Sequence, residues 1–188
     1  MAHRLVVLAS GSGTLAQAIF DARDELGIEI SAVITDRPAA TVLDRATRMG
    51  IHTEVIPVIN SRDDWGVQII ERVGRYKPDL VVSAGFMRIL PPDFVNRFPT
   101  INSHPALLPS FPGAHAVRDA LAAGVTITGT TVHWIDEGVD TGPIITQMEV
   151  PVLVGDDEST LHERIKKVEH GLIVATIALI LPTLEPHV

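Results

Sequence analysis

The chain has 188 residues, of which 46% are hydrophobic and 20% are charged, a composition that indicates one compact domain and excludes a disordered chain. Its net charge of −8 argues against a nucleic-acid partner, because neutralising phosphates requires clustered Lys and Arg. The absence of cysteine excludes disulfides, thiolate metal ligands and cysteine nucleophiles, and it fits a reducing, cytoplasmic environment.

Neither the N-terminal segment nor the longest apolar run has the length of a targeting or membrane segment. The apolar run within MAHRLVVLAS is too short for a signal peptide and predicts a strand. Residues 171–181 form the longest apolar run, about half of the roughly 20 residues that a membrane span needs. We therefore expect a core helix there and no membrane partner.

Strands and helices are predicted to alternate through the first half of the chain. The strands are apolar, β-branched runs at residues 4–9, 29–35, 52–58 and 79–84. The helices between them carry apolar residues at helical spacing or end at glycine, at residues 15–26, 41–49 and 62–76. This alternation is typical of βαβ units, so we predict an α/β fold: a Rossmann-like open, mostly parallel sheet with helices on both faces.

The second half predicts a hairpin and a long helix. Residues 126–135 and 142–152 look like two strands joined by a short polar turn, which favours an antiparallel hairpin at the far side of the sheet. Thr160 and Glu163 have the spacing of a capping box, so the last helix is predicted to begin at TLHE. Its predicted buried stripe consists of Leu161, Ile165, Val168, Leu172, Ala175 and Leu179.

The loop ASGSGTLAQA at residues 9–18 is the first candidate site. Glycines allow close approach of a ligand to the backbone, and a helix N-terminus presents free N–H groups to an anion. Gly11, Gly13 and Ala16 match the dinucleotide fingerprint, and Asp36 falls near the end of the second strand, where that fold keeps a ribose-binding acid. The same glycines would equally serve as a turn that permits tight strand–helix packing.

The segment NSHPALLPSFPGAH at residues 102–115 is the second candidate site. Asn102 and His104 are two residues apart, so on an extended backbone their side chains share a face at the carboxyl end of a strand. Asn donates to a developing oxyanion, and His exchanges a proton near neutral pH. The three prolines that follow stiffen the loop, which predicts a rigid cleft wall.

The segment TTVHWIDEGVDTGPI at residues 130–144 is the third candidate site. Asp140 lies in a turn between Gly138 and Gly142, where aspartate also serves ordinary turn chemistry. His133 on the preceding strand is either a packed core histidine or part of the site. Two histidines and a carboxylate could ligate a metal, but no H-x-x-x-H or H-x-H spacing supports this, and we expect no metal.

Taken together, five motifs resemble the phosphoribosylglycinamide formyltransferase family, the folate-dependent transferases of purine biosynthesis. They cover nearly the whole chain in the family's order: VVLASGSGT, DLVVSAGFMRIL, INSHPALLPSFPG, GTTVHWIDEGVDTGPI and LHERIKKVEH. The resemblance implies the formyltransferase fold in one domain, residues 1–188. Residues 1–100 would form the phosphate- and nucleotide-binding half, and residues 101–188 the catalytic and folate-binding half.

The resemblance implies transfer of a formyl group from the co-substrate 10-formyltetrahydrofolate to the amine of glycinamide ribonucleotide. It assigns this chemistry to Asn102, His104 and Asp140, with His133 in support. Both substrates are small molecules, and the enzyme is expected to be a monomer or homodimer.

The resemblance also assigns the two substrate subsites. Gly13, Thr14 and Leu15 would hold the ribonucleotide phosphate, and Glu169 the glycinamide portion. Folate would contact Asn102, Arg62 and the backbone of residues 87–90, and the loop of residues 136–140 would close on the pterin. The folate residues are therefore Arg62, Met87, Arg88, Ile89, Leu90, Asn102, Asp136, Val139 and Asp140.

Two departures and several alternatives accompany this resemblance. Many relatives carry Asn where this chain has Leu15, and many continue beyond the point at which this chain stops, Val188. The glycine fingerprint leaves a NAD(P)-dependent oxidoreductase as the main alternative. A formyl-folate hydrolase, a formyltransferase for a related amine and a non-catalytic nucleotide-binding module remain the others.

Overall fold

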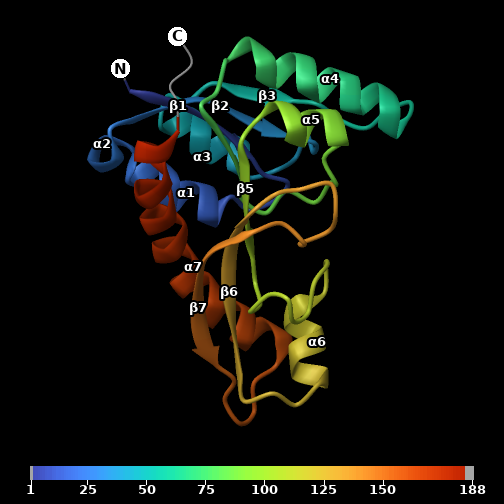
Figure 1. Ribbon diagram of the computed structural model, residues 1–188, viewed down its shortest axis with the longest axis vertical. Helices are drawn as coiled ribbons and strands as arrows, with labels where there is room; N and C mark the ends of the chain where they lie inside the picture. Colours follow the sequence, from blue (N-terminus) through green and yellow to red (C-terminus); the bar gives the residue numbers. More distant parts are fainter. Residues whose placement is uncertain (1, 185–188) are drawn as a thin grey trace.

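The computed structural model describes residues 2–184, which form a seven-stranded sheet in the order β3-β2-β1-β4-β5-β6-β7 (Figure 1). The strands are β1 (His3–Leu8), β2 (Ile28–Thr35), β3 (Thr53–Val55), β4 (Leu80–Ser83), β5 (Thr100–His104), β6 (Ile127–Trp134) and β7 (Ile144–Pro151). Neighbouring strands from β3 to β5 pair in parallel, whereas β6 is antiparallel to both β5 and β7. The predicted mostly parallel sheet with an antiparallel hairpin is confirmed.

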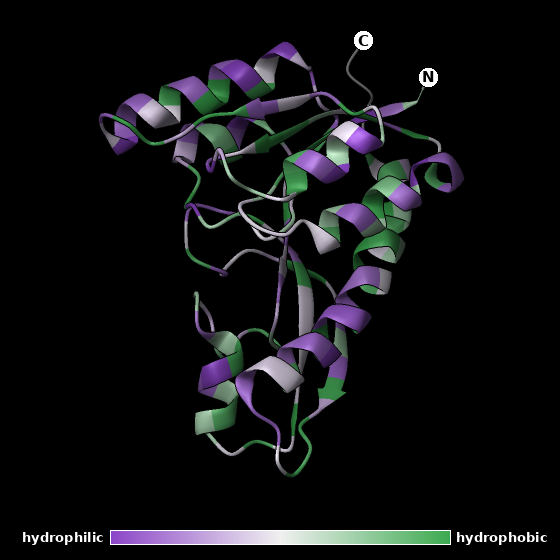
Figure 2. Ribbon diagram, turned by 180° about the vertical axis from the view of Figure 1, so that it is seen from behind, coloured by the Kyte–Doolittle hydropathy of each residue, from purple (hydrophilic) through white to green (hydrophobic). Residues whose placement is uncertain are grey.

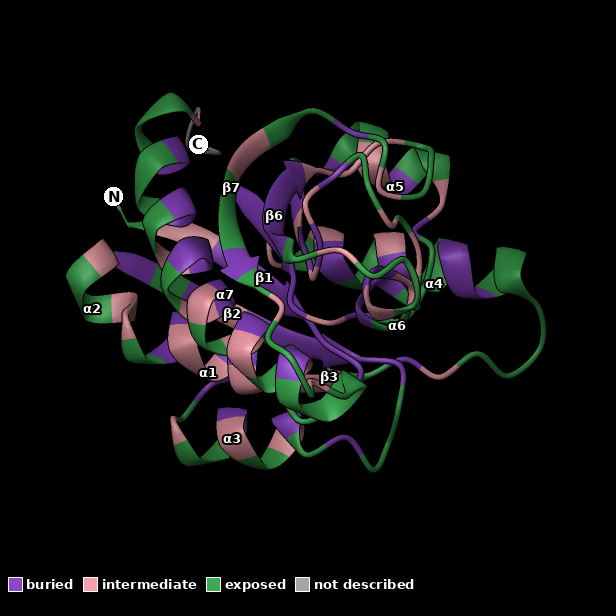
Figure 3. Ribbon diagram, turned by 90° about the horizontal axis from the view of Figure 1, so that it is seen from below, coloured by how far each residue is buried: buried purple, intermediate pink, exposed green. Residues whose placement is uncertain are grey.

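Helices cover both faces of the sheet, as predicted (Figures 1 and 3). They are α1 (Thr14–Asp21), α2 (Arg23–Leu26), α3 (Val42–Arg48), α4 (Arg62–Arg75), α5 (Pro92–Arg97), α6 (Ala116–Ala122) and α7 (Glu158–Ile180), followed by the 3₁₀ turn η1 (Leu181–Thr183). Alternate residues of β1 enter two separate cores. Leu5 and Val7 pack with α1, α3 and α7, whereas Val6 and Leu8 pack with α4 and α5.

The hairpin of β6 and β7 extends away from the parallel part of the sheet and carries a small core of its own. This core joins Val117 of α6, Val150 of β7 and Leu161 and Ile165 of α7. Figure 2 shows α7 changing from mostly hydrophilic near its start to mostly hydrophobic near its end. The apolar end packs against α1, so the predicted core helix at residues 171–181 belongs to the last turns of α7. No helix within residues 2–184 combines the length and apolar character needed to cross a bilayer.

The start of α7 differs from the prediction. The capping box uses Asp157 and Thr160: Asp157 Oδ1 accepts from the Thr160 N–H at 2.8 Å, and Thr160 Oγ1 accepts from the Asp157 N–H at 2.9 Å. The predicted pairing of Thr160 with Glu163 is therefore wrong, because the Asp157 carboxylate caps the helix one turn earlier.

The buried face of α7 also differs in its second half. Leu161, Ile165 and Leu172 are buried as predicted, but Ala175 and Leu179 are exposed. The face runs instead through Glu169, Ile173, Thr176, Ile177 and Ile180. The buried face includes a carboxylate, Glu169, and a hydroxyl, Thr176, which a search for apolar residues does not select. The second half of the predicted stripe therefore lies on a neighbouring face of the helix.

The bounds of several other helices and strands also differ from the prediction. The helix predicted over residues 15–26 is two helices that meet at Ala22, and the predicted strand over residues 52–58 is reduced to the three residues of β3. The hairpin strands are separated by a nine-residue loop, residues 135–143, rather than a short turn. Helices α5 and α6 were not predicted, since six and seven residues carry too little periodicity.

Candidate active site

A cavity of about 660 Å³ opens at the carboxyl ends of the central strands. The loops after β1, β4 and β6 line it, together with the end of β5, the start of α6 and one side of α7. The neighbours of β1 are β2 on one side and β4 on the other. The successive strands are therefore added toward one edge of the sheet up to β3 and toward the opposite edge from β4 onwards, and this reversal lies beside the cavity. Open α/β sheets bind ligands at such switch points.

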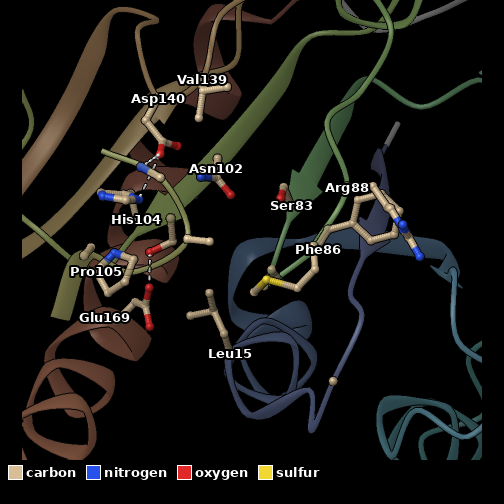
Figure 4. A pocket seen from close by; sticks show the side chains of 18 of the residues that line it. Leu15, Ser83, Phe86, Arg88, Asn102, His104, Pro105, Val139, Asp140 and Glu169 are labelled. Atoms are coloured by element: carbon tan, nitrogen blue, oxygen red, sulfur yellow. Dashed lines mark hydrogen bonds and ion pairs between the residues drawn. The ribbon is translucent and has the colours of Figure 1, made fainter. Parts of the chain in front are cut away.

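His104 at the end of β5 is buried, and both of its ring nitrogens face acceptors; Figure 4 shows the ring close to Asp140. Nδ1 lies 3.3 Å from Oδ2 of Asp140, and Nε2 lies 2.8 Å from the carbonyl oxygen of Phe111. A carboxylate and a carbonyl both accept hydrogen bonds, so the ring satisfies both only when each nitrogen carries a proton. The ring is thus held between the Asp140 carboxylate and the Phe111 carbonyl.

Asp140, in the loop after β6, is contacted by His133 and Gly113 in addition to His104. The Gly113 N–H donates to Oδ2 at 2.8 Å, and His133 Nε2 lies 3.5 Å from Oδ1. Burial is the largest influence and raises the pKa of Asp140, but together the hydrogen bonds from His133 and Gly113 and the charges of both histidines hold the pKa below its usual value. Asp140 therefore remains a carboxylate at neutral pH.

Two glycines and a left-handed residue shape this loop. Asp140 has φ 54°, a conformation that aspartate tolerates better than most residues. A Cβ at Gly142 would collide with the Trp134 carbonyl oxygen, and one at Gly138 would collide with Thr141 Oγ1. The loop therefore requires glycine at position 142, where the obstacle is backbone, whereas at Gly138 the obstacle is a side chain.

Asn102 reaches the same centre through the pairing of β5 with β6. It lies opposite His133 in the antiparallel register, and its Nδ2 is 3.3 Å from His133 Nε2. His133 Nδ1 donates to the Trp134 carbonyl oxygen at 2.8 Å, which directs its Nε2 toward both the Asn102 amide and the Asp140 carboxylate. His133 thus contacts both Asn102 and Asp140, and the predicted trio converges on one point of the cavity.

Polar side chains of the hairpin, which were not predicted as functional, anchor the proline-containing loop of residues 105–113. Thr131 Oγ1 donates to the Ala106 carbonyl oxygen at 2.7 Å and accepts from the Leu108 N–H at 3.1 Å. Gln147 Nε2 donates to the Leu108 carbonyl oxygen at 2.8 Å. These bonds hold the loop at the cavity wall. There its Phe111 carbonyl contacts His104 and its Gly113 N–H donates to Asp140.

The glycine loop after β1 offers backbone donors to an anion. Gly13 caps α1 with φ 70° and no side-chain cap, which leaves first-turn N–H groups beside the cavity. A Cβ at Gly13 would approach Val42 Cγ2 to 2.5 Å, so glycine is required for space as well as conformation. Thr14 and Leu15 line the cavity next to it, and Leu15 is buried.

The acid of the dinucleotide fingerprint is already engaged. Asp36 is 4% exposed; its Oδ1 accepts from Ser10 Oγ at 2.6 Å and its Oδ2 from Arg88 Nε at 2.7 Å. Ser10 Oγ also accepts from the Met87 N–H at 2.9 Å. The carboxylate therefore ties the loop after β1 to the loop after β4 and is not free to bind a ribose.

The residues predicted to hold folate fall into two groups. Met87, Arg88, Ile89, Leu90, Asp136 and Val139 line the cavity. The Arg88 guanidinium turns to Asp36, so only its backbone fits the predicted role. Arg62 is exposed in the first turn of α4 and does not line the cavity.

The predicted Glu169 lines the cavity on α7, and three further residues of this helix that were not predicted line it as well. These are Glu158, His162 and Lys166, which precede Glu169 at intervals of four, four and three residues and so share its face. His115 at the start of α6 lines it as well. Across residues 2–184, no cluster of three or more His, Asp or Glu is placed to hold a metal ion.

A buried histidine paired with a carboxylate, beside an amide donor at the carboxyl ends of a parallel sheet, defines an α/β enzyme that acts on a carbonyl group. The model of the formyl transferase family matches residues 3–177, and the chain belongs to this family.

Its relatives confirm the resemblance predicted from the motifs. Phosphoribosylglycinamide formyltransferase of Mycobacterium tuberculosis strain H37Rv is 53% identical over 180 residues, which cover 93% of this chain and 83% of that protein. The enzyme of the same name from Escherichia coli K12 is 39% identical over 93% of this chain and 85% of its own length. The crystal structure of glycinamide ribonucleotide transformylase 1 from Symbiobacterium toebii superposes with a TM-score of 0.94 at 41% identity, covering 97% of this chain and 89% of that one.

Proposed function

We propose that this enzyme transfers the formyl group of 10-formyltetrahydrofolate to the amine of glycinamide ribonucleotide, a step of purine biosynthesis. The convergence of Asn102, His104 and Asp140 at one point of the cavity carries this proposal. The relatives named above supply the identity of the acceptor.

The folate supplies the formyl group, and attack by the substrate amine on the formyl carbon places negative charge on the formyl oxygen. Asn102 donates a hydrogen bond to that oxygen, and the protonated ring of His104 stabilises it with its positive charge, donating to it when the formyl oxygen takes the place of the Phe111 carbonyl. Removing one such donor typically costs about 10²–10³ in rate. Asp140 favours the charged ring and, through a water, helps to carry the proton from the attacking amine to the folate nitrogen that leaves.

The proposed subsites follow the cavity walls. The first-turn N–H groups at Gly13, Thr14 and Leu15 receive the phosphate, a role that needs no side-chain donor at Leu15. The loops after β4 and β6 receive the folate, with the pterin against residues 136–140. Because Arg62 lies outside the cavity, its proposed contact is with the part of the folate that projects from it.

Steady-state turnover with both substrates tests the proposal. We expect robust formation of tetrahydrofolate that requires glycinamide ribonucleotide. Turnover without the amine would instead identify a formyl-folate hydrolase, and transfer to another sugar amine in preference would identify a related formyltransferase.

The engaged Asp36 carboxylate argues against the dinucleotide-binding alternative. NADH fluorescence gives the corresponding check. We expect no saturable enhancement at micromolar protein, and such an enhancement would favour the oxidoreductase.

A further inference from the structure

The buried face of α7 contains one acidic side chain, Glu169. It follows Ile165 by one turn and precedes Leu172, and it is 7% exposed. A buried carboxylate is costly unless it is hydrogen-bonded, so packing alone does not account for it. Glu169 also lines the cavity, where it can meet a substrate.

Ser103 provides the hydrogen bond that Glu169 receives. It lies on β5 between Asn102 and His104, and its Oγ donates to Glu169 Oε1 at 2.7 Å (Figure 4). Thr130 Oγ1 lies 3.5 Å behind the Ser103 hydroxyl, where it can donate in turn. Within residues 2–184, Ser103 is the one hydrogen-bond donor to this carboxylate, and Oε2 is left for a ligand.

The charged groups around Glu169 are few. Burial raises its pKa, whereas the Ser103 hydrogen bond and the charge of Lys166 lower it. His104 from β5 and His162 from α7 line the same cavity. The Ser103 hydroxyl is therefore the direct contact that favours the ionised form of Glu169 against its burial.

We propose that Ser103 is a positioning residue whose hydroxyl fixes one oxygen of the Glu169 carboxylate, so that the other accepts a hydrogen bond from a hydroxyl or amino group of the ribonucleotide. This proposal rests on the proposed function and deepens it. Ser103 neither touches the reacting formyl group nor transfers a proton. It acts through Glu169 on substrate affinity and leaves the chemical step to its neighbours on the strand.

Kinetics of Ser103→Ala separate this role from a general disturbance of β5. We expect the KM for glycinamide ribonucleotide to rise about 10-fold, the loss of one hydrogen bond to a charged group, with kcat and the KM for folate within about 2-fold. Ser103→Thr keeps the hydroxyl and should recover most of the affinity. Equal losses in kcat and in both KM values would show a structural role and overturn the proposal.

Thr128→Ala is the matched control. Thr128 is a buried hydroxyl on β6 with no hydrogen-bond partner in the described part of the chain. Its removal should leave all three constants unchanged. A similar rise in the ribonucleotide KM would attribute the Ser103 effect to lost packing and overturn the proposal.

A double-mutant cycle and a carboxyl titration complete the test. In a Glu169→Gln background, Ser103→Ala should change the ribonucleotide KM less than about 2-fold, and additive effects would overturn the proposal.

The titration uses protein whose glutamates carry ¹³C at the carboxyl carbon. Ser103→Ala should raise the pKa of Glu169, and the Glu169→Gln variant identifies which resonance belongs to Glu169. An unchanged titration would mean that Ser103 does not hold the carboxylate. No transfer to glycinamide ribonucleotide by the wild type overturns the proposed function, whereas this titration still decides the Ser103 contact.

Discussion

Asp140 and His104 are 36 residues apart in the sequence, and their Oδ2 and Nδ1 atoms lie 3.3 Å apart at the wall of the cavity. The antiparallel pairing of β5 with β6 brings the two segments together. The proline-containing loop then closes the contact with one backbone group on each partner, the Phe111 carbonyl on His104 and the Gly113 N–H on Asp140. This pair is the centre on which the proposed chemistry depends.

Replacing Asp140 with Asn should lower kcat by at least about 10²-fold, because the carboxylate that favours the charged ring and assists proton transfer is lost. Asn also tolerates the left-handed conformation, so the loop should keep its shape. Steady-state formyl transfer measures the effect, with circular dichroism as a check on folding. Asp119→Asn, at a partly exposed carboxylate on α6 that does not line the cavity, should retain full activity. A loss below about 5-fold for Asp140→Asn would remove this residue from the mechanism.

The lowered pKa of Asp140 predicts how its contribution to stability depends on pH. A carboxyl group whose pKa is depressed by folding stabilises the protein above its unfolded pKa, and this contribution is lost as the pH falls through the folded value. Urea unfolding from about pH 5.5 downwards should therefore show a constant difference between wild type and Asp140→Asn until about pH 4, and a shrinking difference below it. A difference that vanishes already by about pH 5 would contradict the prediction.

Tyr76 gives a clean spectroscopic test, since it is the only tyrosine in the sequence. Burial, with a hydrogen bond to Glu54 and its negative charge, raises the pKa of Tyr76 to about 12. Because the folded value lies above the unfolded one, the neutral phenol stabilises the fold below about pH 10, and this is lost as the pH rises through the folded value. Tyrosinate absorbance should show the late titration. Glu54→Gln should lower the pKa, whereas the exposed Glu29→Gln should not.

Gly13→Ala should destabilise the protein by at least about 2 kcal/mol, because the new Cβ meets Val42 in a left-handed backbone. It should also raise the KM for glycinamide ribonucleotide more than that for folate, since the phosphate-binding turn is displaced. Gly171→Ala in α7 is the control, with no atom near its Cβ, and should gain about 0.5–1 kcal/mol. Equal stability of the two variants in urea unfolding would contradict this account.

Local sequence patterns predicted most of the strands and the longer helices. Continuous apolar runs predicted β1, β2 and β4, because strands buried on both faces need no polar side. The short helices α5 and α6 were not predicted, because each has fewer than two full turns in which a helical period could be recognised. The register of α7 failed for a different reason, since its buried face includes Glu169 and Thr176, whose burial depends on partners elsewhere in the chain.

The sequence by itself determined the alternation of strands and helices, the glycine turn, and the motifs that placed Asn102, His104 and Asp140 in one family's order. Only the tertiary structure decided which of these groups meet. It set the contact of His133 with Asn102, the engagement of Asp36 by Ser10 and Arg88, and the bond from Ser103 to Glu169. The physical reason is that periodicity reports which face of an element is apolar, whereas side-chain contacts depend on strand register and loop path, and long-range pairing sets both.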